Sequence, residues 1–126
     1  MKIRLIFLCL LGLGASLIAA CGSSAPPATP TPSGDPVAGQ TKFMSTCSAC
    51  HGPNAKGIPG LGKDLTTSTF AKGLADSELV AFVIKGRDAS EPLNTTGVAM
   101  PPKGGNPALT EKDLGDIVAY LRTLEK

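Results

Sequence analysis

The chain has 126 residues, with twelve lysine and arginine side chains against ten aspartate and glutamate, and a formal net charge of +2. Two of the basic residues, Lys2 and Arg4, lie in a segment that we expect to be removed, which leaves ten residues of each sign. Because no basic run occurs elsewhere, this balance argues against a nucleic-acid-binding protein. Four phenylalanines, one tyrosine and no tryptophan supply few large side chains for a core.

Residues 1–20 are typical of a secretory signal peptide. Two basic residues precede an uncharged apolar run, residues 5–20, that is short for a membrane-spanning helix. The run ends in Ile18-Ala19-Ala20-Cys21, which resembles a bacterial lipobox. Cys21 is therefore expected to be acylated and to anchor the protein by lipid on the extracytoplasmic, periplasmic side of the cell membrane. The alternative is an uncleaved anchor in which Cys21 is an ordinary small residue.

Residues 21–35 have the composition of a tether. Residues 25–32 are rich in proline and small side chains and show no apolar periodicity. Proline-rich linkers extend by about 3.1 Å per residue, so this segment would hold a domain at a distance from the membrane. The remaining residues, 36–126, are enough for one small domain, whose own side chains would bury only a marginal core.

Helical signals dominate this domain, and no segment shows the alternation of a strand, so we expect an all-α fold. The first helix should begin at Pro36, because Asp35 is a good N-cap residue and proline is favoured in the first turn. A second helix is expected in the apolar segment 74–84, opened by Asp76 and Ser77 and with Gly86 as its C-cap. The last helix should follow Thr110, which opens a capping box before an apolar repeat of helical spacing.

The first predicted helix leads into Cys47-Ser48-Ala49-Cys50-His51, the spacing that attaches a c-type haem covalently. The two cysteine sulfurs would form thioethers with the haem vinyl groups, and His51 would bind the iron as an axial ligand. The pattern occurs once, which predicts a single haem c. A haem, as a large apolar disc, would also supply the core that the domain lacks.

A redox pair, a zinc site or a structural disulfide accounts for the two cysteines less well than a haem does. A thioredoxin-type redox pair requires alternating strands and helices. A structural zinc site requires about four cysteine or histidine ligands, but His51 is the only histidine and no cysteine follows Cys50. A disulfide between Cys47 and Cys50 would close a very small loop and leave the histidine without a role.

Elimination points to Met100 as the second axial ligand. Met1 lies in the signal peptide, and Met44 precedes Cys47 on the same predicted helix, close to the histidine's side of the haem. Met100 lies in the segment 98–102, whose prolines disfavour a helix and stiffen an extended loop. That arrangement suits a thioether held at the iron. Ligation by a lysine and an open iron site remain as alternatives.

Over residues 36–126 the chain resembles the class I (mitochondrial-like) cytochromes c. Gly39 and Phe43, before the cysteine motif, match the family's glycine and aromatic residue, and Tyr120-Leu121 matches the pair on the last helix. The resemblance implies three to five helices around one covalent haem, with the N- and C-terminal helices crossing closely at Gly39. It also implies that Phe43 packs against Tyr120.

The resemblance assigns two more residues to the haem site. Ile58-Pro59-Gly60-Leu61 is similar to the family segment in which a proline carbonyl accepts the N–H of the ligand histidine. Pro59 is therefore expected to orient His51, and Leu61 to contact the haem.

A haem with both axial positions filled has no place for a substrate, so the sequence predicts an electron carrier rather than an enzyme. Histidine and methionine together raise the reduction potential relative to two histidines. The expected partners are a quinol-oxidising complex as donor and an oxidase or a photosynthetic reaction centre as acceptor. Lys56, Lys63 and Lys103 would offer a modest docking patch, although solvated surface charges explain them equally well.

Two other classes of function fit the same motif. One is a fixed haem subunit of a membrane quinol-oxidising or terminal oxidase complex, such as the monohaem subunit of an alternative complex III-type assembly. The other is an open-site haem enzyme or sensor.

Overall fold

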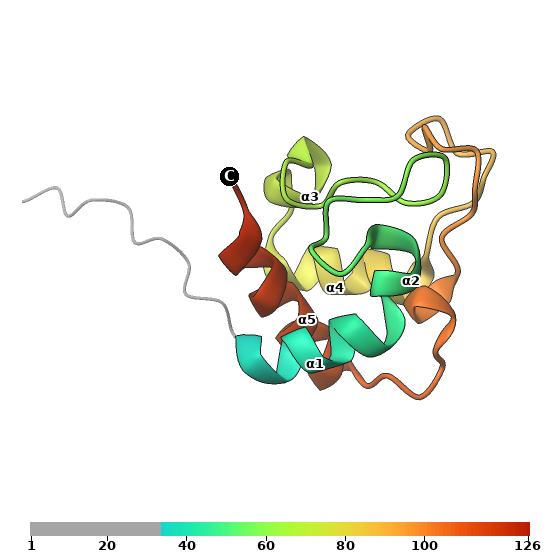
Figure 1. Cartoon of the computed structure of the whole chain (residues 1–126). Helices are drawn as coiled ribbons and strands as arrows, with labels where there is room; N and C mark the ends of the chain where they lie inside the picture. The colour runs from blue at the N-terminus through green and yellow to red at the C-terminus, as the bar shows by residue number, and fades with distance from the viewer. Residues whose placement is uncertain (1–33) are drawn as a thin grey trace, which may run out of the picture.

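The computed structural model describes residues 34–126, so the expected signal peptide, Cys21 and most of the tether lie outside the described residues. Residues 34–126 form five α-helices and one 3-10 helix, and Figure 1 shows how loops join them. They are α1 (Pro36–Thr46), α2 (Ser48–His51), α3 (Thr69–Gly73), α4 (Asp76–Lys85), η1 (Pro102–Gly105) and α5 (Glu111–Leu124). The β-pairing in this range consists of two isolated bridges. The prediction of an all-α domain is confirmed.

The predicted helix starts are also found. The Asp35 carboxylate accepts hydrogen bonds from the backbone N–H groups of Val37 and Ala38, at 2.8 and 3.2 Å, and α1 begins at Pro36. In α5, the Thr110 hydroxyl accepts from the N–H of Asp113 at 3.1 Å, and the Asp113 carboxylate accepts from the N–H of Thr110 at 3.0 Å. These bonds satisfy N–H groups that the first helical turn leaves without partners.

The second predicted helix is found within its apolar segment and begins at one of the residues expected to open it. α4 starts at Asp76, and the Glu78 carboxylate accepts the backbone N–H of Ala75 at 2.8 Å. It ends before Gly86, the predicted C-cap. Helix α3 was not predicted; it is a single short helix capped by the Ser68 hydroxyl, which accepts the N–H of Ala71 at 3.2 Å. None of the helices in residues 34–126 has the length and apolar character needed to cross a bilayer.

The first and last helices cross closely at Gly39, as predicted. A β-carbon at this position would overlap the backbone carbonyl of Asp116 on α5. One turn further along α1, the ring of Phe43 lies 5.6 Å from that of Tyr120, measured between centroids, with the rings tilted by 56°. The glycine therefore permits a backbone approach that lets the aromatic pair close the interface.

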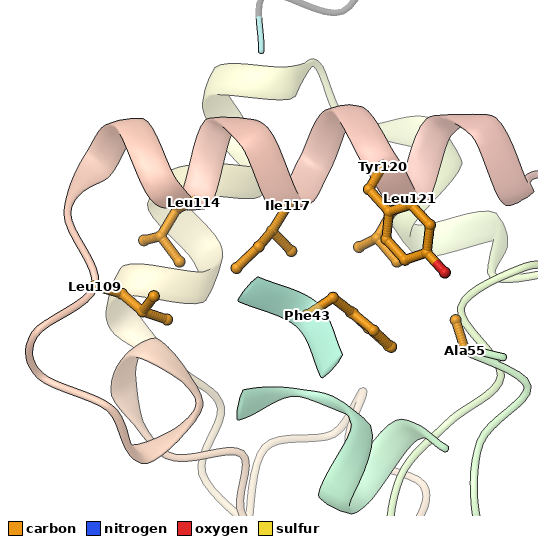
Figure 2. Close-up of a cluster of buried hydrophobic side chains, with 7 residues drawn as sticks. All are labelled: Phe43, Ala55, Leu109, Leu114, Ile117, Tyr120 and Leu121. Atoms are coloured by element: carbon orange, nitrogen blue, oxygen red, sulfur yellow. The ribbon is translucent and has the colours of Figure 1, made fainter. Parts of the chain in front are cut away.

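The main core lies beneath α5 and around Phe43, whose side chain is completely buried (Figure 2). Partly buried side chains, including that of Cys47, pack against it. The core thus connects the helix crossing directly to the cysteine motif. Its buried members are Phe43, Ala55, Leu109, Leu114, Ile117, Tyr120 and Leu121.

Polar contacts fix α5 to the rest of the domain at both ends. Near its start, the buried Asp116 carboxylate accepts the backbone N–H of Asp35 at 2.8 Å and an N–H of Lys112 at 2.6 Å. Near its end, the Arg122 guanidinium donates to Asp76 at 2.8 Å and to the carbonyl oxygen of Leu74 at 2.7 Å. These contacts hold α4 and the start of α1 against the last helix.

Candidate haem-binding site

The cysteine motif follows α1 as a short helical turn. The N–H of Cys47 donates to the carbonyl of Phe43 at 2.8 Å, and the N–H of His51 donates to the carbonyl of Cys47 at 3.0 Å. Residues three and four apart lie on the same face of a helix. Cys47, Cys50 and His51 therefore share one face, as attachment of one haem through two sulfurs and a neighbouring imidazole requires.

The two cysteines of the motif form no disulfide within residues 34–126, so both sulfurs are available for haem attachment. Burial, with a smaller contribution from Cys50, raises the pKa of the Cys47 thiol to about 11. Before haem attachment this thiol is therefore neutral at neutral pH, which suits an apolar setting.

The imidazole of His51 is oriented by a backbone carbonyl, but not by the predicted one. Nδ1 lies 2.9 Å from the carbonyl oxygen of Lys63. Because a carbonyl only accepts, Nδ1 carries the proton and Nε2 keeps the lone pair that an iron atom would need. The assignment of this contact to Pro59 is wrong: the acceptor lies four residues further along the chain.

The turn that contains Pro59 explains the difference. The N–H of Leu61 donates to the carbonyl of Ile58 at 3.0 Å, which places Pro59 and Gly60 at the two central positions of a tight turn. Proline followed by a residue of positive φ is typical of a type II turn, and Gly60 has a φ of 73°. Pro59 is exposed at the tip of this turn. The chain comes close to the His51 ring only after the turn, at Lys63.

Met100 is held in place by a short backbone pairing. Its N–H donates to the carbonyl of Arg87, and the N–H of Arg87 donates to the carbonyl of Met100, both at 2.8 Å. Gly86 makes this approach possible, because it has a φ of 75° and a β-carbon there would overlap the Met100 carbonyl. The end of α4 thus fixes the position of the methionine backbone.

One pocket brings these segments together. The cysteine motif lines one part of it, and Leu61 and Met100 line others, although they lie far apart in the sequence. Pro59 does not contribute to this lining. The apolar wall comes mainly from α1, α4 and α5. Its apolar side chains are Phe43, Leu65, Leu79, Phe82, Val83, Val98, Ile117 and Leu121.

The comparisons with known proteins agree with this geometry. The sequence model of the cytochrome c family matches residues 36–125. The chain belongs to the cytochrome c family. It is 35% identical to cytochrome c-555 of Chlorobaculum thiosulfatiphilum over 88 residues, which cover 69% of this chain and 93% of that protein. It is 34% identical to cytochrome c-555 of Prosthecochloris aestuarii over 84 residues, or 66% of this chain and 81% of that protein.

As a cytochrome c, the protein carries one covalent haem c and acts as an electron carrier that exchanges electrons with redox partner proteins. The residues present fit this group. Two thiols and an imidazole share one helical face beside an apolar pocket, and a methionine lines the same pocket. When bound, the haem supplies an iron that cycles between the ferrous and ferric states. The chain supplies the covalent attachment and the apolar enclosure, and His51 Nε2 would be available to the iron as an axial nitrogen.

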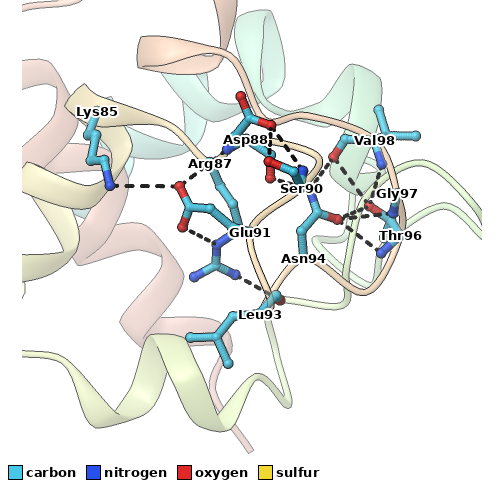
Figure 3. A network of polar contacts seen from close by, with 10 residues as sticks. All are labelled: Lys85, Arg87, Asp88, Ser90, Glu91, Leu93, Asn94, Thr96, Gly97 and Val98. Carbon is cyan, nitrogen blue, oxygen red and sulfur yellow. Dashed lines mark hydrogen bonds and ion pairs between the residues drawn. The ribbon is translucent and has the colours of Figure 1, made fainter.

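The loop before Met100 was not predicted to have a role, but a network of polar contacts organises it (Figure 3), and its residues Asn94 and Val98 line the same pocket as Met100. The amide oxygen of Asn94 accepts hydrogen bonds from the N–H groups of Thr96 and Gly97, at 3.1 and 3.0 Å. Its amide nitrogen donates to the carbonyls of Asp88 and Val98, at 3.0 and 2.8 Å. One side chain thus folds the loop that precedes Met100. Asparagine commonly bonds the backbone two or three residues ahead, which was the available sequence signal.

The three lysines of the expected docking patch differ in their surroundings. Lys56 and Lys63 are exposed. The ammonium group of Lys103, by contrast, donates to the carbonyl oxygen of Leu109 at 2.8 Å and lies 3.4 Å from that of Pro107. Lys103 therefore has a structural role, because it satisfies backbone carbonyls of the loop before α5.

Proposed function

We propose that this cytochrome c is a membrane-tethered carrier of single electrons whose haem iron is ligated by His51 and Met100. It would pass electrons between respiratory or photosynthetic complexes, from a quinol-oxidising complex to an oxidase or a reaction centre. The observation that carries the proposal is the single pocket lined by both His51 and Met100.

The orientation of each candidate ligand supports the assignment. The bond from His51 to Lys63 leaves Nε2 free for iron, and the double pairing with Arg87 fixes the backbone of Met100. Filled axial positions leave no site for a substrate, which favours electron transfer over catalysis. A thioether opposite an imidazole also gives the relatively high potential that suits a carrier between such complexes.

The ferric spectrum of the holoprotein tests the methionine ligand. A thioether-ligated ferric haem has a weak near-infrared charge-transfer band, and Met100→Ala should abolish it. Met44→Ala is the matched control, because Met44 lies on α1 with 45% of its surface exposed and should leave the band unchanged. A wild-type protein without the band, or a Met100→Ala protein that keeps it, would refute the ligation.

The lipid anchor requires a separate test, because Cys21 lies outside the described residues. We propose that Cys21 is acylated and that the proline-rich tether holds the haem domain on the periplasmic side of the membrane. Two or more acyl chains anchor a protein stably, whereas one chain alone binds only marginally. The proposal predicts that the mature protein partitions with membranes.

The test replaces residues 1–21 with a secretory signal that is not lipidated. The resulting protein should be soluble after export, with haem attached and an unchanged spectrum. It should turn over more slowly with a membrane partner at low concentration, because the tether no longer raises the local concentration. Mass spectrometry that finds an unmodified cysteine at the mature N-terminus would contradict the lipid anchor and leave the haem assignment intact.

A further inference from the structure

Arg87 is a buried cation in the wall of the haem pocket. It follows Gly86, the C-cap of α4, and only 11% of its side-chain surface is exposed. Its guanidinium carbon lies 4.3 Å from the ring centroid of Phe70 and 4.7 Å from that of Phe82. Contacts of a guanidinium with aromatic faces stabilise the cation and restrict its motion. The two rings therefore hold the charge in one place.

The hydrogen-bonding capacity of this guanidinium is only partly used. One terminal nitrogen donates to the carbonyl oxygen of Leu93 at 3.2 Å. Nε is buried and has no hydrogen-bond partner among residues 34–126. The Glu91 carboxylate lies 4.0 Å from Nε, which is too far for a hydrogen bond. A buried donor without a partner carries a desolvation cost, especially in a charged group.

The location of Arg87 indicates which kind of partner is missing. The residue lines the same pocket as the cysteine motif and Met100. A haem carries two propionate carboxylates, and a guanidinium binds carboxylates through strong charge-assisted hydrogen bonds. The backbone of the same residue makes both hydrogen bonds to Met100. One residue thus presents a buried cation to the pocket and holds the methionine.

We propose that Arg87 binds a haem propionate and, through its backbone pairing with Met100, positions that methionine at the iron. Arg87 is a positioning residue in this role. The Phe70 and Phe82 rings keep its guanidinium from turning away from the pocket. The inference rests on the proposed ligation of the iron by Met100. A single residue would thus both bind the haem propionate and hold the axial methionine in position.

Competition by external imidazole for the ferric iron tests the positioning role. In Arg87→Gln, Met100 should be displaced more easily, so imidazole should bind roughly tenfold more tightly than to the wild type, equivalent to about 1.4 kcal/mol. Arg87→Lys keeps the positive charge but lacks the planar guanidinium, so its affinity for imidazole should lie between those of the wild type and Arg87→Gln. Arg122→Gln is the control: it removes an arginine that ties α5 to α4, so it should lower stability but not change the imidazole affinity.

A second measurement on the unaltered holoprotein tests the carboxylate contact without a variant. In the ferrous, diamagnetic state, the Nε–H of Arg87 should exchange slowly and show nuclear Overhauser effects to the propionate methylene protons. The midpoint potential should fall in Arg87→Gln, because loss of a nearby positive charge stabilises ferric iron, and should be largely kept in Arg87→Lys. Absence of the Overhauser effects would overturn the propionate contact, and an unchanged imidazole affinity in Arg87→Gln would overturn the positioning role.

The results expected if Arg87 has no such role differ from those expected if Met100 does not ligate the iron. A wild-type protein without the near-infrared band would refute ligation by Met100 and, with it, the positioning role. The Overhauser effects would still decide whether Arg87 binds the propionate. A wild-type protein with the band, but with Arg87→Gln indistinguishable from it, would refute the inference alone.

Discussion

The two sides of the haem pocket are stabilised in different ways. On the side of the histidine, α1 and α5 cross at Gly39 and bury apolar side chains such as Phe43 and Leu114 almost completely. On the side of the methionine, the loop between α4 and η1 leaves Leu93 and Val98 60% and 40% exposed. There the chain is fixed by hydrogen bonds that converge on a few side chains.

Because of this difference, one region of the domain should determine its folding stability and another should determine the position of Met100. Apolar burial contributes most of the folding free energy of a domain, so the helix crossing should determine whether the protein folds. A loop with little buried apolar surface opens locally at a lower free-energy cost. The loop before Met100 should therefore determine how firmly this proposed axial ligand is held. Substitutions on one side should change the unfolding midpoint, and those on the other should change the spectrum first.

The largest effect is expected at the helix crossing. Gly39→Val places side-chain atoms against the backbone carbonyl of Asp116 on α5, which can move only together with its helix. The two helices must separate, at a cost of about 3 kcal/mol. Denaturant unfolding of the oxidised holoprotein, followed by circular dichroism, measures this loss.

Gly115→Ala is the matched control for this substitution. It lies on the partner helix α5, where an added β-carbon has no neighbour within 4 Å. Alanine is the better helix former, so this variant should gain up to about 1 kcal/mol. Equal losses in both variants would show that the close approach at Gly39 does not limit stability.

A smaller loss of stability, but a larger change at the iron, is expected from Asn94→Ala. The substitution removes the side chain that organises the loop before Met100. We expect a loss of about 2 kcal/mol at most, because each neutral hydrogen bond contributes about 1 kcal/mol net and the freed backbone groups are partly exposed to water. The near-infrared band should weaken at temperatures well below global unfolding.

Thr95→Ala provides the control within the same loop. Thr95 is exposed and makes no side-chain hydrogen bond within residues 34–126. The spectrum of this variant should therefore follow the wild type up to the unfolding transition. If the band of Asn94→Ala were lost only together with the helical circular dichroism, the loop and the helix crossing would form one cooperative unit.

The contrast between the helical frame and the loop before Met100 also explains which features could be predicted from the sequence. Helix starts such as Asp35-Pro36 and Thr110 depend on local capping chemistry, and the crossing at Gly39 followed from family resemblance. The structure confirms all of them. The cysteine motif is local as well, since its residues are joined by a single helical turn. Short-range patterns were therefore sufficient for the helix starts and for the expected attachment of the haem, whereas the helix crossing required the family resemblance.

The contacts that could not be predicted are set by tertiary packing. The carbonyl that faces His51 depends on where the chain passes after the turn at Pro59, and that path placed Lys63 there. The short helix α3 lacks the length over which apolar periodicity becomes visible. The pairing of Arg87 with Met100 joins residues on either side of a folded loop, so no local spacing reports it.

The smallest effect is expected at Asp116, which joins the start of α1 to α5. Hydrogen bonding by Lys112, and then by the backbone N–H of Asp35, holds the pKa of this carboxyl below its ordinary value. A carboxyl with a lowered folded-state pKa stabilises the protein above its unfolded-state pKa, near 4, and this stabilisation is lost as the pH falls through the folded value. Asp116→Asn should therefore cost about 1 kcal/mol at pH 7, and the difference from the wild type should shrink between about pH 5 and pH 3.

Denaturant unfolding at a series of pH values tests whether the stabilisation by the Asp116 carboxylate is lost as the pH falls. In Asp116→Asn, the new amide oxygen would still accept the N–H of Asp35, so the variant should keep that link to α1 and lose mainly its attraction for Lys112. Glu111→Gln is the control on the same helix, because Glu111 is exposed and forms no ion pair within the described range 34–126. Its effect on stability should vary less with pH. A difference between Asp116→Asn and the wild type that stays constant from pH 7 to pH 3 would show that this carboxylate does not carry the charge-dependent link between the two helices.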